Sequence, residues 1–380
     1  MSGLGWSLEA DRKLLDSHMP GLREALGKHE LAELEQPRGP GIDAFKQAGG
    51  TAMLVPAEHK GSGAAAVDAV RVQRAIGSLS PSLAIATTMH HFSVASLVEM
   101  ATGSESGLEW MMLQAIAQHG LLVASGFAEG KTGQHVFRPT MKARRTDDGI
   151  VVDGVKKPCS LTWSMQLLTA SVLVSENGRP DRVAVAMIPA ESPGIERRPF
   201  WGSNVLAGAE SDEVVLSEVH VPDRLLVFPE EQEVSRDRQH ARGFIWFEAL
   251  ISASYLGIAS SLAERVLANR KGSPAERVDL AVEIEGARYA LLQLATTLDS
   301  RDPGEASLAE ALLVRYSVQR AVMRTAAAAA ECAGGLQFIS RPDVAYLLGA
   351  SRALGYHPPS YGSAVASLDD YLAGAEFVLK

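Results

Sequence analysis

The chain has 380 residues, 46% hydrophobic and 21% charged, which suits a globular protein with two or three packed subdomains. Its 36 basic and 45 acidic side chains give a formal net charge of −9 without a dense basic run, a pattern that argues against a nucleic-acid partner. Two isolated cysteines, no signal-peptide pattern and no long uninterrupted apolar run predict a cytoplasmic protein without a metal site or a membrane partner.

The first zone, residues 1–119, is predicted to be an all-α domain. Its leucines recur at spacings near three and four residues, which is the period of one helix face. A loop at 61–63 interrupts the pattern, and helices are expected over residues 65–76, 83–100 and 108–119. The second of these helices is apolar and carries two adjacent histidines, His90 and His91.

The second zone, residues 120–230, changes to a period of two with turn residues between the apolar runs. The first run, residues 149–155, is expected to be a strand that enters a tight turn at Asp153–Gly154. Further strands are expected over 167–174, 183–188 and 213–221, and Pro222 ends the last one. Short strands separated by Gly and Pro predict a small barrel or sandwich.

The third zone, residues 231–380, returns to helical patterning, with helices expected over 244–268, 275–298 and 305–333. Gly334 and Gly335 end the last of these helices. The alanine run at 326–330 allows a neighbouring helix to approach closely. Long helices with short links predict an antiparallel bundle.

Five segments, spread over nearly the whole chain, carry short motifs in this order: LVPAEHKGSG (54–63), SGFAEGKTGQ (125–134), DGVKKPCS (153–160), VVLSEVHVP (214–222) and ECAGG (331–335). Together with the order α, β, α, they resemble the acyl-CoA dehydrogenase superfamily. The resemblance implies an α+β fold with an N-terminal helical domain, a central β-barrel or sandwich and a C-terminal four-helix bundle. It also implies a flavin-dependent oxidoreductase.

The resemblance places a flavin between the β domain and the bundle. FAD is expected, with FMN or a diffusible reduced flavin as alternatives. A hydroxyl near the flavin N5 can donate a hydrogen bond to the reduced ring, whereas the residues alone would make Ser160 a turn-capping serine. Matching positions put Ser125, Phe127, Ala128, Gly133 and Gln134 along the ring and pyrophosphate, Pro158 and Ser160 at the other side, Gly334 and Gly335 beside a partner subunit's cofactor, and Arg270 as the candidate for the missing phosphate-binding arginine.

The pattern from Arg352 to Pro359 resembles the end region of the flavin monooxygenase branch of this superfamily, which often has a histidine at the place of His357. That branch also often carries a histidine pair before the barrel. His91, Ser160 and His357 therefore form a candidate catalytic trio that could hydrogen-bond an oxygen adduct of the reduced flavin and deliver a proton to it. This reading favours hydroxylation or N-oxidation of a small molecule.

Two other functions stay open. The first is α,β-dehydrogenation of an acyl thioester, on CoA or a carrier protein, with Glu248 as the base, because a minority of the family places its base within one residue of this position. A shift of one residue turns a helical side chain by about 100°, so Glu248 also fits a buried carboxylate paired with Arg242 or another cation. The second is a non-catalytic scaffold that has lost the flavin.

The resemblance also implies a homodimer or homotetramer, because family members build each flavin site across a subunit interface. A flavin reductase or an electron-transfer flavoprotein is the candidate redox partner. The substrate pocket would be lined by aromatic side chains, namely Phe244, Trp246, Phe247 and residues around Trp163.

Overall fold

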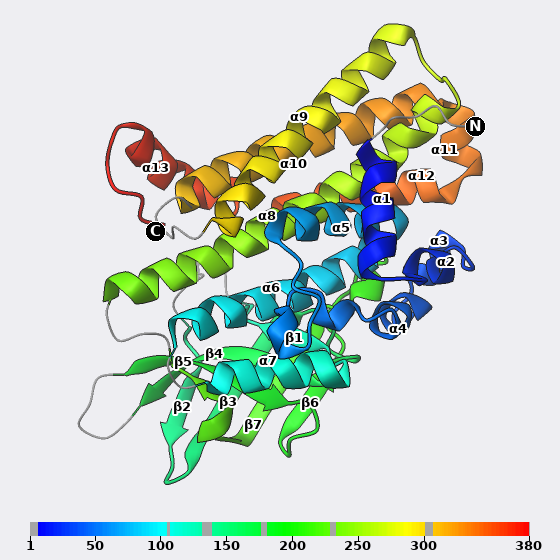
Figure 1. The fold of residues 1–380 in the computed structure, drawn as a ribbon. Helices are drawn as coiled ribbons and strands as arrows, with labels where there is room; N and C mark the ends of the chain where they lie inside the picture. Colours follow the sequence, from blue (N-terminus) through cyan, green and yellow to red (C-terminus); the bar gives the residue numbers. More distant parts are fainter. Residues whose placement is uncertain are drawn as a thin grey trace.

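The computed structural model describes residues 7–104, 107–130, 139–175, 181–228, 233–300 and 307–379. Figure 1 shows helices at the start of the chain, a sheet in the middle and long helices at the end, which confirms the predicted α+β order. The candidate cofactor residues Gly133 and Gln134 lie outside the described residues.

The N-terminal helices include those predicted over 65–76, 83–100 and 108–119, now α5, α6 and α7. Helix α6 begins after Ser80, whose hydroxyl accepts a hydrogen bond from the backbone N–H of Leu83, and Pro81 occupies the first turn. The helices of this part are α1 (Ser7–His18), α2 (Leu22–Leu26), α3 (Leu31–Leu34), α4 (Pro40–Gln47), α5 (Ala66–Leu79), α6 (Pro81–Gly103) and α7 (Leu108–His119).

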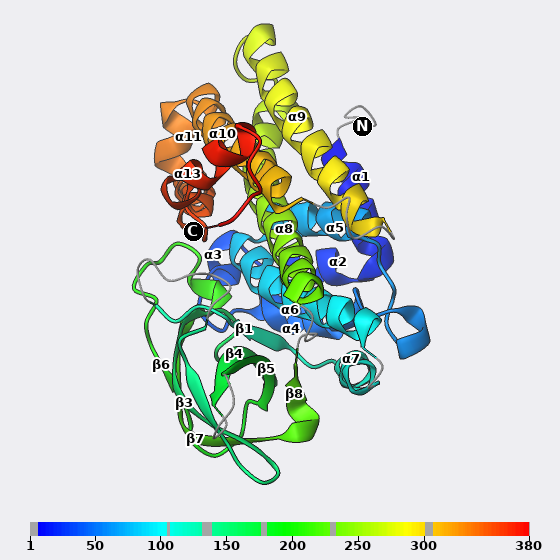
Figure 2. The same cartoon turned by 90° about the vertical axis from the view of Figure 1, so that its left-hand side faces the viewer.

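The described strands form one mixed sheet in the order β6-β7-β3-β2-β4-β5-β8, with β1 paired in parallel to β4. Figure 2 shows the sheet curled on itself, with α6 lying across it near β1. The barrel alternative of the prediction therefore describes this part better than the sandwich. The strands are β1 (Val123–Gly126), β2 (Lys142–Arg145), β3 (Gly149–Cys159), β4 (Leu167–Ser175), β5 (Arg182–Pro189), β6 (Ile195–Arg198), β7 (Asp212–Pro222) and β8 (Leu226–Val227).

The predicted tight turn at Asp153–Gly154 is wrong. Strand β3 continues through these residues to Cys159 because β7 pairs with it on both sides of them. The register shifts by one residue at this point, where Glu218 of β7 adopts a left-handed φ of 51° and its N–H donates to Asp153 Oδ1 at 2.8 Å. An Asp-Gly pair is therefore accommodated opposite a β-bulge, which long-range pairing imposes.

The C-terminal part consists of three long helices and shorter ones that follow them. Helix α8 packs against α5, α6 and α10, and the apolar core of its stretch from Ala241 to Ala268 is buried inside the protein. This stretch is therefore a core helix, although it is long and apolar enough to cross a membrane. The helices are α8 (Glu233–Ala268), α9 (Pro274–Asp299), α10 (Leu308–Ala333), α11 (Gly335–Ser340), α12 (Pro342–Ser351) and α13 (Tyr361–Leu372), with a 3-10 turn η5 (Arg352–Tyr356).

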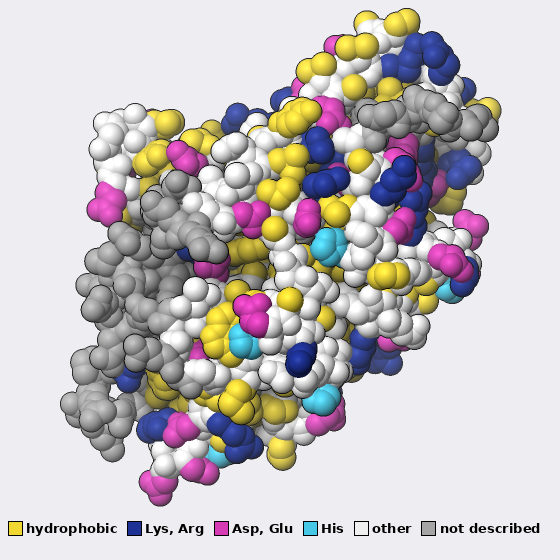
Figure 3. All heavy atoms as spheres, viewed as in Figure 1, with side chains coloured by type: hydrophobic (Ala, Val, Ile, Leu, Met, Phe, Trp, Pro, Cys, Tyr) yellow, Lys and Arg dark blue, Asp and Glu magenta, His cyan; other side chains and the backbone are white. Residues whose placement is uncertain are grey.

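Charged side chains of both signs meet around α1 on the surface. Arg12 lies 2.8 Å from Glu264 of α8, and Arg23 lies 3.0 Å from Glu9. Figure 3 shows such basic and acidic groups side by side on this face. Partly exposed pairs of this kind stabilise a fold by about 0–1 kcal/mol each, so they contribute little to the stability of the packed α1.

Helices α5 and α8 approach each other through two glycines. A Cβ added at Gly77 would lie 2.2 Å from the carbonyl oxygen of Ser254, and one at Gly257 would lie 2.1 Å from that of Arg74. Both distances are far below van der Waals contact, and the atoms met are backbone atoms that cannot turn away. The close crossing of α5 and α8 therefore requires glycine at both positions.

We predict that Gly257→Ala lowers the free energy of unfolding by at least about 2 kcal/mol, because the added methyl forces α8 away from α5. The matched control is Gly286→Ala on α9, where an added Cβ would meet nothing within 4 Å. That change should leave stability unchanged or raise it by about 0.5–1 kcal/mol through helix propensity. Urea unfolding followed by circular dichroism measures both, and equal stabilities of the two variants would contradict the close crossing.

Candidate active site

Aromatic rings from the three parts of the chain meet at one point. The Phe92 ring of α6 lies 5.4 Å from that of Phe127, in the loop after β1, and 5.5 Å from that of Phe247 on α8. The Phe247 ring lies 6.2 Å from the His357 ring and 5.6 Å from that of Phe244. These five residues are called the aromatic cluster below. The cluster brings together two predicted site residues, Phe127 and His357, that are 230 positions apart.

The two segments expected to flank the flavin lie side by side. The N–H of Lys157 donates to the carbonyl oxygen of Ala128 at 3.0 Å, which joins the segment after β1 to the end of β3. A buried ion pair reinforces this junction, with Lys156 Nζ 3.0 Å from Glu129 Oε1. Burial opposes ionisation of Glu129, but hydrogen bonds from Thr140 and the charge of Lys156 lower its pKa to about 2.

Ser160 sits on a strained turn at the end of β3. Its hydroxyl lies 2.9 Å from that of Ser211, and the next residue, Leu161, is buried with a left-handed φ of 65°. A branched side chain seldom adopts this conformation, which costs on the order of 1–3 kcal/mol. Two backbone hydrogen bonds hold it, from Leu161 N to Ala209 O at 3.0 Å and from Thr162 N to Glu210 O at 3.2 Å. The strained conformation of Leu161 therefore lowers the stability of the fold, and it fixes the position of the neighbouring Ser160.

A buried carboxylate supports the loop that holds this turn. The hydroxyl of Tyr346 on α12 donates to Glu35 and accepts from the N–H of Leu206 at 2.9 Å. Glu35 also accepts from the Ser80 hydroxyl at 2.7 Å and the Ser82 N–H at 3.0 Å, while its burial raises its pKa. These contacts connect the N-terminal helices, the loop before β7 and the C-terminal helices within one network.

The Ser125 side chain provides a test of whether a flavin fits here. Ser125 is 7% exposed, and its hydroxyl makes no hydrogen bond to any residue that the structure describes. This hydroxyl can both donate and accept a hydrogen bond, so it is available to a polar group of a ligand. Ser125 and Ser160 therefore offer hydroxyls on the two adjoining segments where the flavin is expected. Phe127 and Ala128 belong to the first of these segments, and Pro158 belongs to the second.

His357 follows η5 and is held at both its ring and its backbone. Its Nε2 lies 2.9 Å from the hydroxyl of the buried Tyr255. The Nη2 of Arg315 donates to the carbonyl oxygens of Leu354 at 2.7 Å and His357 at 2.9 Å. Burial and the nearby charge of Arg315 lower the pKa of His357 to about 3, so the ring is neutral at ordinary pH.

Glu248 is turned away from the aromatic cluster, in which its neighbour Phe247 lies. It is fully buried and lies 2.9 Å from Nε of Arg315, which is also fully buried. Arg242, the partner named in the prediction, binds Glu99 instead. Burial outweighs the attraction of Arg315 and raises the pKa of Glu248 to about 8. Glu248 therefore fits the prediction of a buried carboxyl group paired with a cation rather than the prediction of a catalytic base.

His91 lies in the core of the N-terminal helices. Its ring nitrogens lie 3.3 Å from Gln73 Oε1 and 3.3 Å from the carbonyl oxygen of Gly50, and burial lowers its pKa to about 3. His90 beside it accepts from the N–H of Val123 at 3.1 Å. Among the described residues, no hydrogen bond or ring contact joins His91 to Ser160 or His357. The residue of α6 that reaches the cluster is Phe92, about 100° further round the helix.

The remaining predicted cofactor residues form a second group at the far end of α8. Arg270 is exposed in the turn after α8, and Gly272 of the same turn approaches Cys332 at the end of α10. Gly334 and Gly335 follow directly, and a Cβ at either would meet nothing within 4 Å. Twenty-one residues of helix separate Phe247 from the end of α8, which is roughly 30 Å. Within one chain, this group cannot share a ligand with the aromatic cluster.

The two tryptophans of the predicted pocket have polar partners outside the cluster. Trp246 donates its ring N–H to Glu99 at 3.0 Å, and Trp163 donates to Asp212 at 2.8 Å. Phe244 and Phe247 thus belong to the cluster, whereas no ring contact between described residues joins either tryptophan to it.

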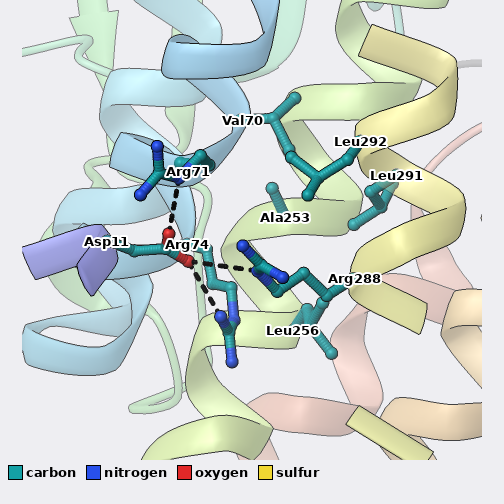
Figure 4. Close-up of a pocket in the computed structure, with 9 residues that line it drawn as sticks. All are labelled: Asp11, Val70, Arg71, Arg74, Ala253, Leu256, Arg288, Leu291 and Leu292. Atoms are coloured by element: carbon teal, nitrogen blue, oxygen red, sulfur yellow. Dashed lines mark hydrogen bonds and ion pairs between the residues drawn. The ribbon is translucent and has the colours of Figure 1, made fainter. Parts of the chain in front are cut away.

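A small cavity lies elsewhere, between α1, α5, α8 and α9 (Figure 4). Asp11 accepts from Arg71 at 2.7 Å and from Arg74 at 2.8 Å there, and Arg288 Nε lies 3.9 Å away. Its volume of about 10 Å³ has room for roughly one water molecule. It is therefore a packing defect beside a buried ion cluster rather than a substrate site.

Sequence reasoning missed three residues of the site: Phe92, Tyr255 and Arg315. Tyr255 lies eight positions after Phe247, which places both on one face of α8, so helical spacing could have found it. Phe92 directly follows the histidine pair and was hidden by it. Arg315 carried no local signal, because all its hydrogen-bond and ion-pair partners except Gln319 lie 39 to 67 positions away in the sequence.

No family model matches the chain. Isobutylamine N-hydroxylase from Streptomyces viridifaciens is 40% identical over 371 residues, which cover 97% of this chain and 98% of that protein. The chain belongs to the flavin-dependent monooxygenase branch of the acyl-CoA dehydrogenase superfamily. A putative acyl-CoA dehydrogenase, YdbM from Bacillus subtilis (strain 168), is 23% identical over 284 residues, 70% of this chain and 72% of that one.

The fold of this monooxygenase also matches a solved structure. The complex of TdsC from Paenibacillus sp. A11-2 with FMN and indole has a TM-score of 0.80 and 16% identity, with 98% of each chain covered. Family membership confirms the predicted flavin-dependent oxidoreductase and favours oxygen chemistry over the acyl-thioester and scaffold readings. The position of Glu248, buried against Arg315, agrees with this outcome.

The raised pKa of Glu248 predicts a pH-dependent stability. Its carboxyl has an ordinary pKa of 4.5 when unfolded and about 8 when folded, so the folded monooxygenase holds a proton that the unfolded chain releases. Its contribution is fully present below pH 4.5 and declines as pH rises through 8. The wild type should lose stability relative to Glu248→Gln over this range, by at most about 1.4 kcal/mol per pH unit.

Urea unfolding of both proteins from pH 5 to 9 measures this difference. Glu24→Gln, at an exposed side chain of α2, reports the pH dependence of the remaining groups. If the stability of wild type and Glu248→Gln differs by the same amount at every pH, the carboxyl stays ionised beside Arg315 and the prediction is wrong.

Proposed function

We propose that this monooxygenase N-hydroxylates a small primary aliphatic amine. The amine, molecular oxygen and reduced flavin become a hydroxylamine, water and oxidised flavin, which balances atoms and electrons. The observation that supports this most is 40% identity to an amine N-hydroxylase along nearly the full length of both chains. The aromatic cluster supplies a second argument, because it offers a small apolar surface at the expected flavin site.

An amine must reach the reacting oxygen with its lone pair free, and therefore neutral. Apolar surroundings disfavour the charged form and lower the pKa of an amine. The rings of Phe92, Phe244 and Phe247 form such surroundings, and the one carboxylate next to them in the sequence, Glu248, is engaged by Arg315. The cluster thus favours the nucleophilic form of the substrate and excludes water.

The chain's polar groups would hold the flavin and handle protons. Reduced flavin supplies the activated oxygen, and the hydroxyls of Ser125 and Ser160 would bind the ring from the two adjoining segments. His357, at the edge of the cluster, would donate or accept a proton at the reacting group. His91 has the weaker case, since both its ring nitrogens already have partners.

The flavin would be FMN or FAD, supplied in reduced form by a separate flavin reductase in a cytoplasmic setting. FMN is favoured by the ligand of the TdsC structure. FAD would need an arginine for its phosphates, and Arg270 could serve only across a subunit interface. An electron-transfer flavoprotein would be the partner of the dehydrogenase alternative rather than of this reaction.

We predict that the purified protein, given reduced FMN or FAD, oxygen and isobutylamine, releases the corresponding hydroxylamine, which mass spectrometry detects. His357→Ala should lower turnover by about a hundredfold, the usual range for a general acid or base, while the protein stays folded at the assay temperature. His29→Ala, at an exposed side chain in the link between α2 and α3, is the matched control. Oxidation of indole but of no amine would refute N-hydroxylation, and bleaching of bound flavin by an acyl thioester would restore the dehydrogenase reading.

Assembly into a homodimer or homotetramer is part of this proposal. Leu336 is 77% exposed and Ile339 is 82% exposed on α11, directly after Gly334 and Gly335. Large apolar side chains this exposed on neighbouring turns favour a subunit contact. Light scattering should show a dimer or tetramer for the wild type and a smaller mass for the double change Leu336→Asp and Ile339→Asp. A monomeric wild type would contradict the assembly.

A further inference from the structure

We propose that Tyr255 is a positioning residue that holds the His357 ring in the tautomer with its proton on Nδ1, so that this N–H is the donor presented to the aromatic cluster. The state of the ring follows from contacts within the chain. Its use in turnover rests on the proposed N-hydroxylation.

The direction of the hydrogen bond between the two residues decides the tautomer. Tyr255 is fully buried on α8, and its hydroxyl lies 2.9 Å from Nε2 of His357. Among the described residues, the Tyr255 hydroxyl makes its hydrogen bond to that nitrogen, and no other described group accepts its proton. If the ring donated instead, a buried O–H would be left without a partner, which proteins rarely tolerate. Tyr255 therefore donates, and Nε2 accepts.

A neutral imidazole carries one proton, so an accepting Nε2 leaves it on Nδ1. The charges that face the ring favour the neutral form. The guanidinium of Arg315 binds the carbonyl oxygen of His357 itself, and a second positive charge beside it in a buried site would be unfavourable. Glu248 lies against Arg315 rather than the ring, and Tyr255 is uncharged because burial raises its pKa.

Hydrogen bonds fix the backbone around His357, so the ring stays within hydrogen-bond distance of Tyr255. Arg315 binds the carbonyl oxygens of Leu354 and His357, and the hydroxyl of Tyr316 donates to those of Pro359 at 3.0 Å and Ser360 at 3.2 Å. Two consecutive residues of α10 therefore hold both sides of His357.

The other nitrogen of the ring is free to meet a ligand. Among the described residues, Nδ1 of His357 has no hydrogen-bond partner, and the residue is half-buried rather than sealed. Its ring meets Phe247 edge-on, at an interplanar angle of 62°. An oriented N–H at the edge of an apolar cluster can bind a lone pair of the substrate or of the activated oxygen without a competing partner in the protein.

The first experiment observes the ring itself in flavin-free protein. Histidine labelled with ¹⁵N is introduced, and the His357 signals are assigned by their loss in His357→Asn. The wild type at pH 7 should show a neutral ring with Nδ1–H favoured at least tenfold, and Tyr255→Phe should lose about tenfold of that preference. Tyr316→Phe instead removes a hydroxyl that donates to the loop backbone at Pro359 and Ser360, and it should leave the tautomer unchanged.

Two outcomes would overturn the assignment. One is a wild-type ring that is cationic or protonated on Nε2. The other is an unaltered Nδ1–H preference in Tyr255→Phe, which would make Tyr255 a packing residue only. The wild-type measurement alone tests the tautomer if a variant fails to fold.

The second experiment separates the tautomer from its use. The amide nitrogen of His357→Asn takes the place of Nδ1, and that of His357→Gln takes the place of Nε2. The Asn variant should retain at least tenfold more hydroxylamine formed per oxygen consumed than the Gln variant, which should release hydrogen peroxide instead. If both variants are equally impaired while the wild-type ring carries its proton on Nδ1, the tautomer stands and its role in the proposed function fails.

Discussion

The position of His357 in the candidate site depends on one buried cation, the guanidinium of Arg315. It lies against Glu248 of α8 and donates to the carbonyl oxygens of Leu354 and His357 and to Gln319, so one side chain ties α8, α10 and the C-terminal segment together. A buried arginine is unfavourable unless its charge and its N–H groups are matched. The cost of removing it would fall on Glu248, left buried without its neighbour, and on two carbonyl oxygens beside the histidine. The position of His357 is therefore coupled to the core of the bundle.

The Ser160 turn of the candidate site is fixed differently, through strained backbone held by a network of hydrogen bonds. Leu161 adopts a left-handed conformation next to Ser160, and its N–H is satisfied by the loop that Tyr346 and Glu35 anchor. Strain of this kind persists only where the surroundings over-determine it. The position of His357 is thus fixed by the charge of Arg315, whereas the position of Ser160 is fixed by the strained backbone of Leu161.

The sequence predicts the elements of this fold well and its long-range contacts poorly. Helices α5, α6 and α7 and strands β4, β5 and β7 follow from apolar periodicity, which is a local property. The Asp153–Gly154 pair was misread because its conformation is set by pairing with β7, some 65 positions away. Phe127 and His357 were found through the family resemblance. Arg315 could not be found, since a lone arginine on an apolar helix shows its role only when Glu248 and the Leu354 carbonyl are in place.

The histidine pair shows how narrow the margin is between a structural and a functional reading. His90, His91 and Phe92 are consecutive on α6, and each turns about 100° from the last. His90 and His91 consequently face α4, Gly50 and Val123, where backbone groups and the side chain of Gln73 satisfy their ring nitrogens. Phe92 faces Phe127 and Phe247 instead. Spacing alone locates the helix but not its rotation, which the packing of the whole domain sets.

The same rotation bears on the chemistry of the fold. Phe247 and Glu248 are neighbours on α8, and only one of them can face the ligand. Here the phenyl ring lies in the aromatic cluster and the carboxyl group of Glu248 lies in the core against Arg315. A base that abstracts a proton from an acyl chain needs the reverse arrangement, with the carboxylate at the reacting carbon. An apolar side chain in that place instead favours a neutral amine beside activated oxygen, so the register of one helix is enough to separate the two reactions on a shared scaffold.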